Sequence, residues 1–354
     1  MLQKYQLFEY LKADNNAGLK ATEDVQKIAD SLGYGVIALR TITDELSVWG
    51  KLLRQMGYQS DMQRACRQIT SNSIVLIQSP FRQKQLLRYR YLKRLKQKKH
   101  VHIISIVHDV EKLRGGDEQK YYEYEFNMIM PLMDVIIVHN EQMKKWFIES
   151  GYSAERIVPL GVFDYLCSPK TYACTAKENY KKVIIAGNLN ANKSGYLQKI
   201  SAISNTTFDL YGSNFNVSDS PNLIYHGSVA PDELPKQLNT GFGLVWDGDS
   251  IDTCDGNTGR YLMFNNPHKL SLYLVSGLPV FIWSHSAEAP FVVKYQLGYT
   301  IDSLKQIPVI LQDLEFSDYV KLKQNAAVVA AKLQKGYFTN TAIMQAESII
   351  ARKP

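Results

Sequence analysis

The chain has 354 residues, of which 45% are hydrophobic and 21% are charged. This is ordinary globular composition, and the length is sufficient for two domains with separate cores. The first thirty residues lack a basic-then-apolar signal pattern, and no apolar run approaches the roughly eighteen residues needed to span a bilayer. Four cysteines without CxxC spacing argue against a zinc framework or a disulfide scaffold. We therefore expect a reduced, cytoplasmic protein.

The formal net charge of +7 is unevenly distributed. Residues 82–100 carry nine Lys and Arg residues and no acidic residue, and apolar side chains recur there at helical spacing: Leu86, Leu87, Tyr91, Leu92 and Leu95. This pattern predicts an amphipathic helix, Arg82–His100, with a basic outer face. A solvated surface helix is one interpretation, and contact with the inner face of an anionic membrane or with an acidic partner is the other. We expect no nucleic-acid partner, because no recognition motif accompanies the charge.

In the first half of the chain, short apolar and β-branched runs alternate with amphipathic stretches. The runs predict strands, and the stretches between them predict helices. The expected strands are 35–39, 73–78, 101–107 and 135–138, and the expected helices are 21–32, 46–56, the basic stretch, 121–133 and 141–150. Strands that alternate with helices indicate parallel βαβ units.

The second half repeats this alternation. The expected strands are 182–186, 207–211, 223–226, 242–245 and 279–283, and the expected helices are 230–238, 267–276 and 317–333. A polar, irregular stretch at 161–182 marks the boundary. We expect an α/β protein with two doubly wound, Rossmann-like domains, 1–165 and 166–335, and a helix in 336–354 that returns to the first domain. The carboxyl ends of both sets of strands would then face a shared cleft.

Four short turns follow strands of the second half: "AGNLNANKSG", "YGSN", "HGSVAPDEL" and "VWDGDS". Each alone is an ordinary glycine-containing turn between a strand and a helix. Their succession at one sheet edge makes them candidates for binding a ligand, through Gly187, Asn188, Lys193, Tyr211 and Gly212. None matches the dinucleotide fingerprint or a P-loop, which disfavours chemistry linked to NAD or driven by ATP.

The stretch "FNNPHKLSLYLVSGLPVFIW" at 264–283 predicts a helix with an unusual first turn. Asn266 would cap it, Pro267 would take the first helical position, and Gly277 would end it. His268 and Lys269 then lie at the positive end of the helix, where cations are disfavoured. A diphosphate bound there would accept the free N–H groups and pair with Lys269. The alternative is that Lys269 extends into solvent at small cost.

These stretches, together with "NNAGLKATEDVQKIADSLGY", "VHDVEKLRGG" and "VIIVHNEQMKKW", resemble a family of bacterial sugar-nucleotide glycosyltransferases with the GT-B fold. The family includes enzymes labelled galactofuranosyltransferases and the glucosyltransferases that extend N-acetylglucosamine on serine-rich repeat adhesins. The resemblance covers nearly the whole chain and is most specific at 241–283. It implies transfer of a hexose, glucose or N-acetylglucosamine, from a UDP-sugar to a GlcNAc-modified Ser or Thr of such an adhesin. The alternatives are hexosyl or galactofuranosyl transfer in cell-surface polysaccharide synthesis, and a non-catalytic partner subunit.

The resemblance also implies roles for individual residues. The family's pyrophosphate-binding lysine falls on Lys269, its basic residue after the "GN" turn falls on Lys193, and an aromatic residue near the nucleotide is replaced by Val229. The remaining expected donor contacts lie beside that lysine and in the N-terminal loop: Pro267, His268, Ser271, Asn16, Ala17 and Gly18. GT-B enzymes stabilise the leaving UDP with basic side chains and helix dipoles. We therefore expect no cofactor and no metal. We also expect the protein to form a homo-oligomer, either a dimer or a tetramer.

An inverting transfer needs a general base near the acceptor hydroxyl. His108 and Asp109 follow the expected strand 101–107, so either could serve as the base, or Asp109 could orient His108. The alternative is that Asp109 caps the following helix. A retaining mechanism is disfavoured, because Glu288 has no glutamate eight residues before or after it. Further candidates for contact with the sugar or the acceptor are Asp247, Asp249, Asp252 and Glu288, and the first two are the alternative metal ligands.

Overall fold

The first domain is built on a parallel sheet of six strands. The computed structural model describes residues 2–10, 17–42, 47–115, 119–168, 177–216 and 220–352. The strands lie in the order β2-β1-β3-β4-β5-β6. They are β1 (Lys4–Glu9), β2 (Gly35–Leu39), β3 (Ile74–Ser79), β4 (His102–Val107), β5 (Val135–Val138) and β6 (Ile157–Pro159). All neighbouring pairs are parallel, as the alternation of strands and helices predicts.

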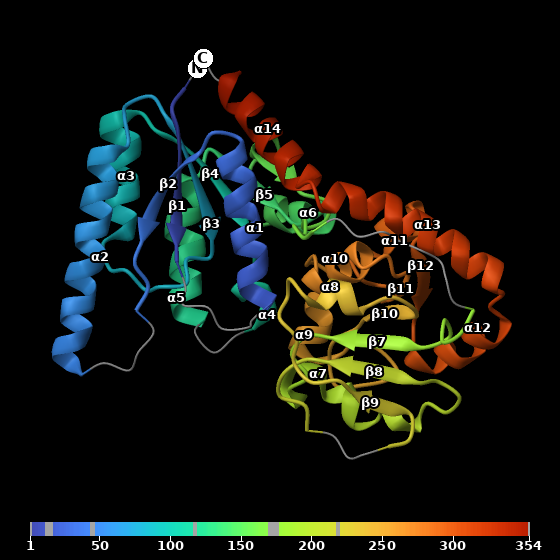
Figure 1. Ribbon diagram of the computed structural model, residues 1–354. Helices are drawn as coiled ribbons and strands as arrows, with labels where there is room; N and C mark the ends of the chain where they lie inside the picture. The colour runs from blue at the N-terminus through green and yellow to red at the C-terminus, as the bar shows by residue number, and fades with distance from the viewer. Residues whose placement is uncertain are drawn as a thin grey trace.

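The second domain carries another parallel sheet of six strands, in the order β12-β11-β10-β7-β8-β9 (Figure 1). The strands are β7 (Val183–Ala186), β8 (Phe208–Tyr211), β9 (Leu223–Tyr225), β10 (Phe242–Val245), β11 (Val280–Trp283) and β12 (Gly298–Ile301). The strand order reverses its direction between β1 and β3 in the first sheet, and between β7 and β10 in the second sheet. In sheets of this kind, ligands bind outside the carboxyl ends of the strands at such switch points. The two doubly wound domains expected from the sequence are therefore present.

Helices cover both faces of the first sheet. Ile74 and Leu76 of β3 pack into a core with α1 (Ala17–Ser31) and α14 (Tyr337–Ala351), whereas Val75 and Ile77 point to the opposite core. That second core is formed with α2 (Val48–Gln68), α3 (Arg88–Lys99) and α6 (Glu141–Glu149). The connection from β4 to β5 contains α4 (Glu111–Arg114), α5 (Gln119–Tyr124), a π-helix at Glu125–Ile129 and a 3-10 turn at Met130–Leu132.

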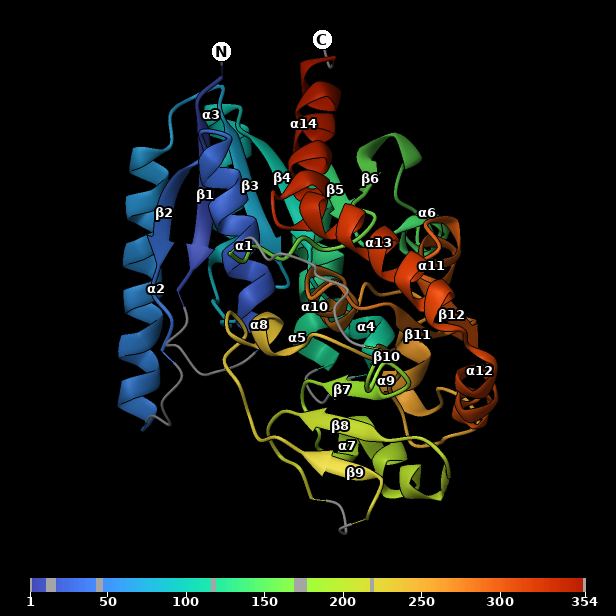
Figure 2. The same cartoon turned by 45° about the vertical axis from the view of Figure 1, so that its right-hand side comes forward.

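The second sheet is covered in the same way. One face packs against α8 (Leu234–Gln237), α10 (His268–Val275), α11 (Ala289–Lys294) and α13 (Phe316–Leu333). The other face packs against the turns that follow α7 (Ala191–Ser194), the end of α9 (Gly256–Tyr261) and α12 (Ile307–Asp313). Helix α14 then leaves this domain and lies on β5, β6 and α1 of the first domain (Figures 1 and 2). Glu347 anchors it there through Lys4 and Tyr34, both at 2.8 Å.

The basic helix is shorter than its pattern predicts. Helix α3 begins at Arg88, and Leu86 is 78% exposed instead of lying on the apolar face. The reason is that Gln55 of α2 accepts a hydrogen bond from the Leu86 N–H and donates one to the Lys84 carbonyl, which holds residues 82–87 in turns. Arg88 is buried and pairs with Glu9 at 2.9 Å, so not every basic residue faces outward. Within the described ranges, no helix is both long enough and apolar enough to cross a membrane.

The glycine turns after β7, β8 and β9 are bonded to one another. The Gly187 N–H donates to the Tyr211 carbonyl at 3.0 Å, and the Gly212 N–H donates to the Gly227 carbonyl at 2.8 Å. Gly212 has a φ of +155°, and a Cβ added there would lie 1.8 Å from the Gly187 carbonyl oxygen. The two N–H groups therefore join turns within the protein, and the expectation that the backbone at Gly187 and Gly212 approaches a ligand stays a prediction.

We predict that Gly212→Ala destabilises the protein by about 3 kcal/mol or more, because backbone strain and a steric clash with Gly187 add together. Gly151→Ala is the matched control. Gly151 also has a positive φ, +94°, but no atom lies within 4 Å of the added Cβ, so a cost of about 1 kcal/mol is expected. Denaturant unfolding of both variants measures the difference. Equal costs would show that the contact with Gly187 imposes no constraint.

Candidate functional site

The loop after β4 lies directly against α9 of the second domain. The Val110 N–H donates to the Tyr261 hydroxyl at 2.8 Å, and Tyr261 is buried. At Gly115, a Cβ would come within 2.8 Å of the Asn257 side-chain nitrogen, so a larger residue there would have to displace the Asn257 side chain. This contact brings the carboxyl end of β4 close to the carboxyl ends of β7 and β10.

Lys269 is directed into the protein and not into solvent. Its Nζ donates to the Trp246 carbonyl and to Asp247 Oδ1, both at 2.9 Å. The side chain of Lys269 is 12% exposed and that of Asp247 is 6% exposed. The lysine in the first turn of α10 is therefore fixed at the carboxyl end of β10, where the second sheet has its switch point.

The start of α10 differs in detail from the expectation. Pro267, not Asn266, occupies the N-cap position, and the helix begins at His268. The Asn266 side chain instead donates to the carbonyls of His139 and Gly161, at 2.8 and 2.9 Å. Asn266 thus joins the two domains, a role that sequence spacing does not reveal.

His268 adds no positive charge to this turn. Its ring stacks on Tyr165 with centroids 4.9 Å apart, and its Nε2 lies 3.4 Å from the Asp164 carbonyl oxygen. Burial lowers the pKa of His268 to about 4, so the imidazole is neutral at pH 7. Lys269 is the cation of the first turn.

A second lysine faces the same place from the turn after β7. Lys193 lies in α7, which Asn190 caps by accepting the Asn192 N–H. The Asp247 carboxylate raises the pKa of Lys193, but burial and the charges of Lys269 and Arg114 outweigh it, and the pKa is lowered. Crowded cations of this kind are stabilised by an anionic ligand.

The first domain contributes Asp109 and Arg114 to this cluster. Arg114 Nη1 lies 3.6 Å from Asp109 Oδ2 and 3.2 Å from Glu111 Oε1. The N-cap of α4 is Val110 and no side chain caps it, so the alternative that Asp109 serves as the helix cap is wrong. Arg114 was not singled out by the sequence, although it lies within the "VHDVEKLRGG" stretch that carries the resemblance.

His108 is less available than Asp109. Its Nε2 lies 2.6 Å from Gln78 Oε1, and its ring stacks on Phe163 with centroids 5.2 Å apart. Burial holds the pKa of His108 well below its usual value, and the nearby His139 lowers it further. A histidine in this setting is a weak base.

Several expected contacts lie elsewhere or are already occupied. Asp252 is exposed and pairs with Lys305 at 2.7 Å. The Ser271 hydroxyl is buried and donates to the Phe163 carbonyl at 2.5 Å, so it fastens α10 and does not face a ligand. The others occupy the rim of the second sheet: Asn188 and Asp249 are exposed, Tyr211 stacks on His226, and Val229 packs partly buried against the core.

The start of α1 approaches the second domain. Ala17 and Gly18 open this helix, and Asn16 lies outside the described residues. Lys20, one turn further on, is buried and pairs with Asp24 at 2.7 Å and with Asp232 of the "PDE" turn at 2.9 Å. This contact between the domains was missed, and the spacing of Lys20 and Asp24 was its only signal in the sequence.

Glu288 lies in a buried polar group between the domains. It is 2% exposed, and its Oε1 accepts a hydrogen bond from Asn140 at 3.4 Å. Burial raises the pKa of Glu288 to about 8. Asn140 also donates to the Asn266 side-chain oxygen at 2.7 Å. Glu288 therefore contacts the first domain directly.

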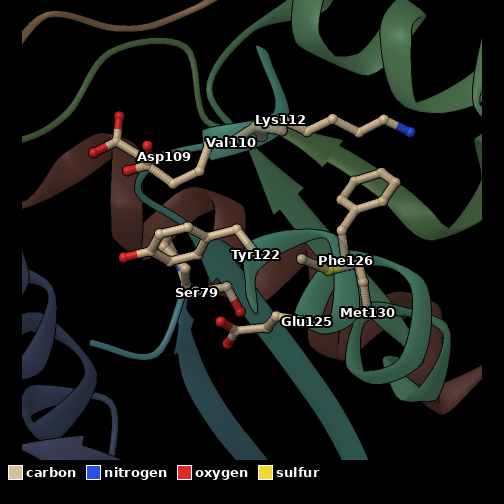
Figure 3. A pocket seen from close by; sticks show the side chains of 10 residues that line it. Ser79, Asp109, Val110, Lys112, Tyr122, Glu125, Phe126 and Met130 are labelled. Carbon is tan, nitrogen blue, oxygen red and sulfur yellow. The ribbon is translucent and has the colours of Figure 1, made fainter. Parts of the chain in front are cut away.

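A cavity opens beside Asp109 in the first domain, at the carboxyl ends of β3 and β4 (Figure 3). The space in it that a water-sized molecule can occupy is about 20 Å³, and it is lined by Ser79, Pro80, Asp109, Val110, Glu111, Lys112, Tyr122, Glu125, Phe126 and Met130. Asp109 thus belongs both to this cavity and to the charged cluster. In the described part of the chain, no group of three or more His, Cys, Asp or Glu residues is placed to hold a metal ion.

Comparison with known proteins identifies the family. Residues 4–162 match the N-terminal domain, and residues 183–346 match the C-terminal domain, of the family described as glucosyltransferase 3-like. The chain belongs to this family. It is 30% identical over 326 residues to the β-1,6-galactofuranosyltransferase WbbI of Escherichia coli (strain K12), covering 91% of this chain and 92% of that protein. It is also 24% identical to glucosyltransferase 3 of Streptococcus gordonii, covering 95% and 96% of the two chains.

Solved structures confirm the architecture. Sucrose-phosphate synthase from Thermosynechococcus elongatus superimposes with a TM-score of 0.62 at 10% identity, covering 99% of this chain and 100% of that one. At this identity the likeness shows the fold alone. The protein is thus a glycosyltransferase of the GT-B fold, as the resemblance implies.

We predict that Lys269→Ala weakens UDP binding by about 1.5–3 kcal/mol, the scale of a charge-assisted hydrogen bond. The loss also leaves Asp247 buried without this partner, and its charge would repel a diphosphate. Titration calorimetry with UDP measures the change, and circular dichroism checks the fold. Lys294→Ala, an exposed position of the same domain, serves as the control. A UDP affinity within twofold of the wild type would refute the phosphate role of Lys269.

Proposed function

We propose that the protein transfers a hexose, glucose or N-acetylglucosamine, from a UDP-sugar to a GlcNAc-modified Ser or Thr of a serine-rich repeat adhesin. The observation that carries this proposal is the pair of Lys193 and Lys269 at the start of α10, which faces Asp109 and Arg114 of the first domain. A cation cluster at a helix N-terminus suits a diphosphate. A carboxylate on the facing domain suits an acceptor hydroxyl.

In this mechanism the diphosphate of the donor binds at the first turn of α10, against Lys269 and Lys193. The acceptor oxygen attacks the anomeric carbon, and the bond between that carbon and the diphosphate oxygen breaks as UDP leaves. The hydroxyl proton passes to Asp109. The lysines and the helix dipole stabilise the negative charge that develops on UDP. Attack from the side opposite UDP inverts the anomeric configuration.

Asp109 is the better candidate for the base. It is 36% exposed, lines the cavity and is not used as a helix cap. His108 is engaged with Gln78, and its lowered pKa makes it a poor proton acceptor. In this proposal His108 positions the loop and Asp109 takes the proton.

We predict that Asp109→Asn lowers turnover about a hundredfold or more while UDP affinity stays close to that of the wild type. The separation is expected because Asp109 lies in the first domain, and the diphosphate contacts come mainly from the second. Steady-state kinetics with a glycopeptide acceptor and UDP calorimetry measure the two effects. His108→Ala serves as the comparison and should reduce turnover less. Full activity of Asp109→Asn would move the search for the base to Asp249.

No cofactor and no metal are part of the proposal. Lys193, Lys269 and the α10 dipole supply the positive charge that a divalent cation supplies in other transferases. We predict that activity survives treatment with EDTA followed by removal of the chelator. A loss of activity that Mn²⁺ restores would contradict this and would assign the diphosphate site to Asp247 and Asp249. The measurement is UDP release before and after treatment.

Galactofuranosyl transfer is the second candidate. The relative named as a galactofuranosyltransferase is 30% identical to this chain, whereas the one named glucosyltransferase 3 is 24% identical. A screen of UDP-glucose, UDP-N-acetylglucosamine, UDP-galactose and UDP-galactofuranose, read out as UDP release with a glycopeptide acceptor, distinguishes the two. Failure to bind UDP at millimolar concentration would instead favour a non-catalytic partner subunit.

The proposal includes two surfaces on the first domain. Exposed apolar side chains at the start of α2, Val48, Trp49 and Leu53, support a homo-oligomer, either a dimer or a tetramer. The basic outer face of α3, which carries Lys93, Arg94 and Lys98, supports a contact with an anionic membrane surface. Sedimentation of the protein alone and with anionic vesicles tests both surfaces.

A further inference from the structure

Lys20 is a buried lysine whose ammonium group joins three parts of the chain. It lies in the first turn of α1, and its Nζ lies 2.7 Å from Asp24 Oδ1 of the same helix. The same atom lies 2.9 Å from Asp232 Oδ1, in the turn 226–233 that follows β9 of the second domain. It also donates to the Leu166 carbonyl, in the segment between the two sheets. These acceptors use all three N–H groups of the ammonium.

The two carboxylates that pair with Lys20 are held in different ways. Asp24 is buried and also accepts the Leu166 N–H at 2.8 Å, so it is fixed in place. Asp232 is 68% exposed. If the domains separate, Asp232 returns to water at little cost, and Lys20 keeps Asp24 as its counter-ion. The pair of Lys20 and Asp232 can therefore break and form again, whereas the pair of Lys20 and Asp24 remains.

A second contact holds the turn after β9 against the segment between the sheets. The Tyr165 hydroxyl donates to the Pro231 carbonyl at 2.6 Å. The centroid of the Tyr165 ring lies 5.1 Å from Lys20 Nζ and 4.9 Å from the centroid of the His268 ring, which stacks on it. His268 begins α10, whose first turn is the proposed diphosphate site. The turn after β9 is therefore connected to that site through Tyr165.

The bridge between Lys20 and Asp232 lies beside two segments that are expected to contact the donor. Lys20 follows Gly18 in the first turn of α1, and Asp232 follows Val229 in the turn after β9. The two segments belong to different domains, and Figure 2 shows the start of α1 close to α8, which follows the turn. The bridge thus holds the two segments together.

We propose that Lys20 and Asp232 are positioning residues for the transfer, and that their ion pair holds the two domains closed over the donor. The proposal rests on the proposed transferase function and adds a closing contact to it. The pair forms when the domains meet and breaks when they separate to admit the donor or to release UDP. Closure places Asp109 of the first domain opposite Lys269 of the second. Neither Lys20 nor Asp232 contacts the reacting atoms.

Asp232→Asn tests this proposal, because an exposed carboxylate can be replaced by an amide of the same shape without a change in the core. The charge of the bridge is lost, and the closed arrangement becomes less populated. We expect kcat to fall about fivefold or more, while the Kd for UDP stays within about twofold of the wild type. UDP affinity is maintained because the proposed UDP contacts come mainly from the second domain. Asp232→Glu keeps the charge and should restore most of kcat.

Small-angle X-ray scattering in the presence of UDP measures closure directly. The radius of gyration should be larger for Asp232→Asn than for the wild type, and close to the wild type for Asp232→Glu. Asp318→Asn is the matched control, because Asp318 is exposed and pairs with Lys321 at 2.9 Å within α13 of the second domain. This variant should change neither kcat nor the radius of gyration, since its ion pair does not join the domains.

A kcat for Asp232→Asn within twofold of the wild type would overturn the proposal. A lower kcat with an unchanged radius of gyration would also overturn it, because Asp232 would then act within its own domain. Equal losses in Asp232→Asn and Asp232→Glu would do the same, since the charge would not be the cause. Failure of the proposed function gives a different result: the wild type would release no UDP with any donor or acceptor, and the difference in scattering would remain.

Discussion

The pairing of Lys269 with Asp247 is the interaction on which the active-site arrangement depends. A lysine in the first turn of a helix meets the positive end of the helix dipole, and here the lysine is also largely buried. Both effects are unfavourable unless a negative group is close. Asp247 and the Trp246 carbonyl supply it in the protein itself, and in the proposed function the diphosphate of the donor would supply it as well. The same pair holds the Lys269 side chain in position.

The position of this pair relative to the first domain is fixed by direct contacts between the two domains. The Val110 N–H bonds to Tyr261, Asn140 bonds to Asn266, and helix α14 crosses back onto the first sheet. These contacts hold the loop after β4 opposite the loops after β7 and β10. In the proposed mechanism, Asp109 from one domain and the two lysines from the other act on the same bond. Removal of either set should therefore affect different constants.

The sequence predicts the repetitive parts of this structure well. Strand β10 occupies the same residues, 242–245, as the apolar run, and the ends of α13 differ by one residue at most from the pattern. Strand β1 was not predicted, because "KYQLFE" mixes polar and apolar residues without a β-branched run, although it lies between β2 and β3. Strand β12, "GYTI", was not predicted either. In both cases pairing with neighbouring strands outweighs a weak local signal.

The site is less predictable, because its decisive contacts join residues far apart in the chain. The pattern around Lys269 identifies the residue but not its bond to Asp247, and Asn266 looks like a helix cap although it joins the domains. Nothing local distinguishes Glu125 from an exposed glutamate such as Glu123, since its burial follows from the packing of the π-helix against β3 and β4. The sequence pattern identifies polar residues that lie near the end of a strand. Tertiary packing determines which of these side chains are buried and which partners they contact.

A crystal structure of the protein with UDP tests the central claim most directly. The account predicts that the diphosphate lies at the first turn of α10, with its oxygens within hydrogen-bond distance of Lys269 Nζ and with Lys193 beside them. Asp109 should remain on the opposite side of the cleft. A structure in which UDP binds elsewhere, with Lys269 still bonded only to Asp247 and Trp246, would contradict the account.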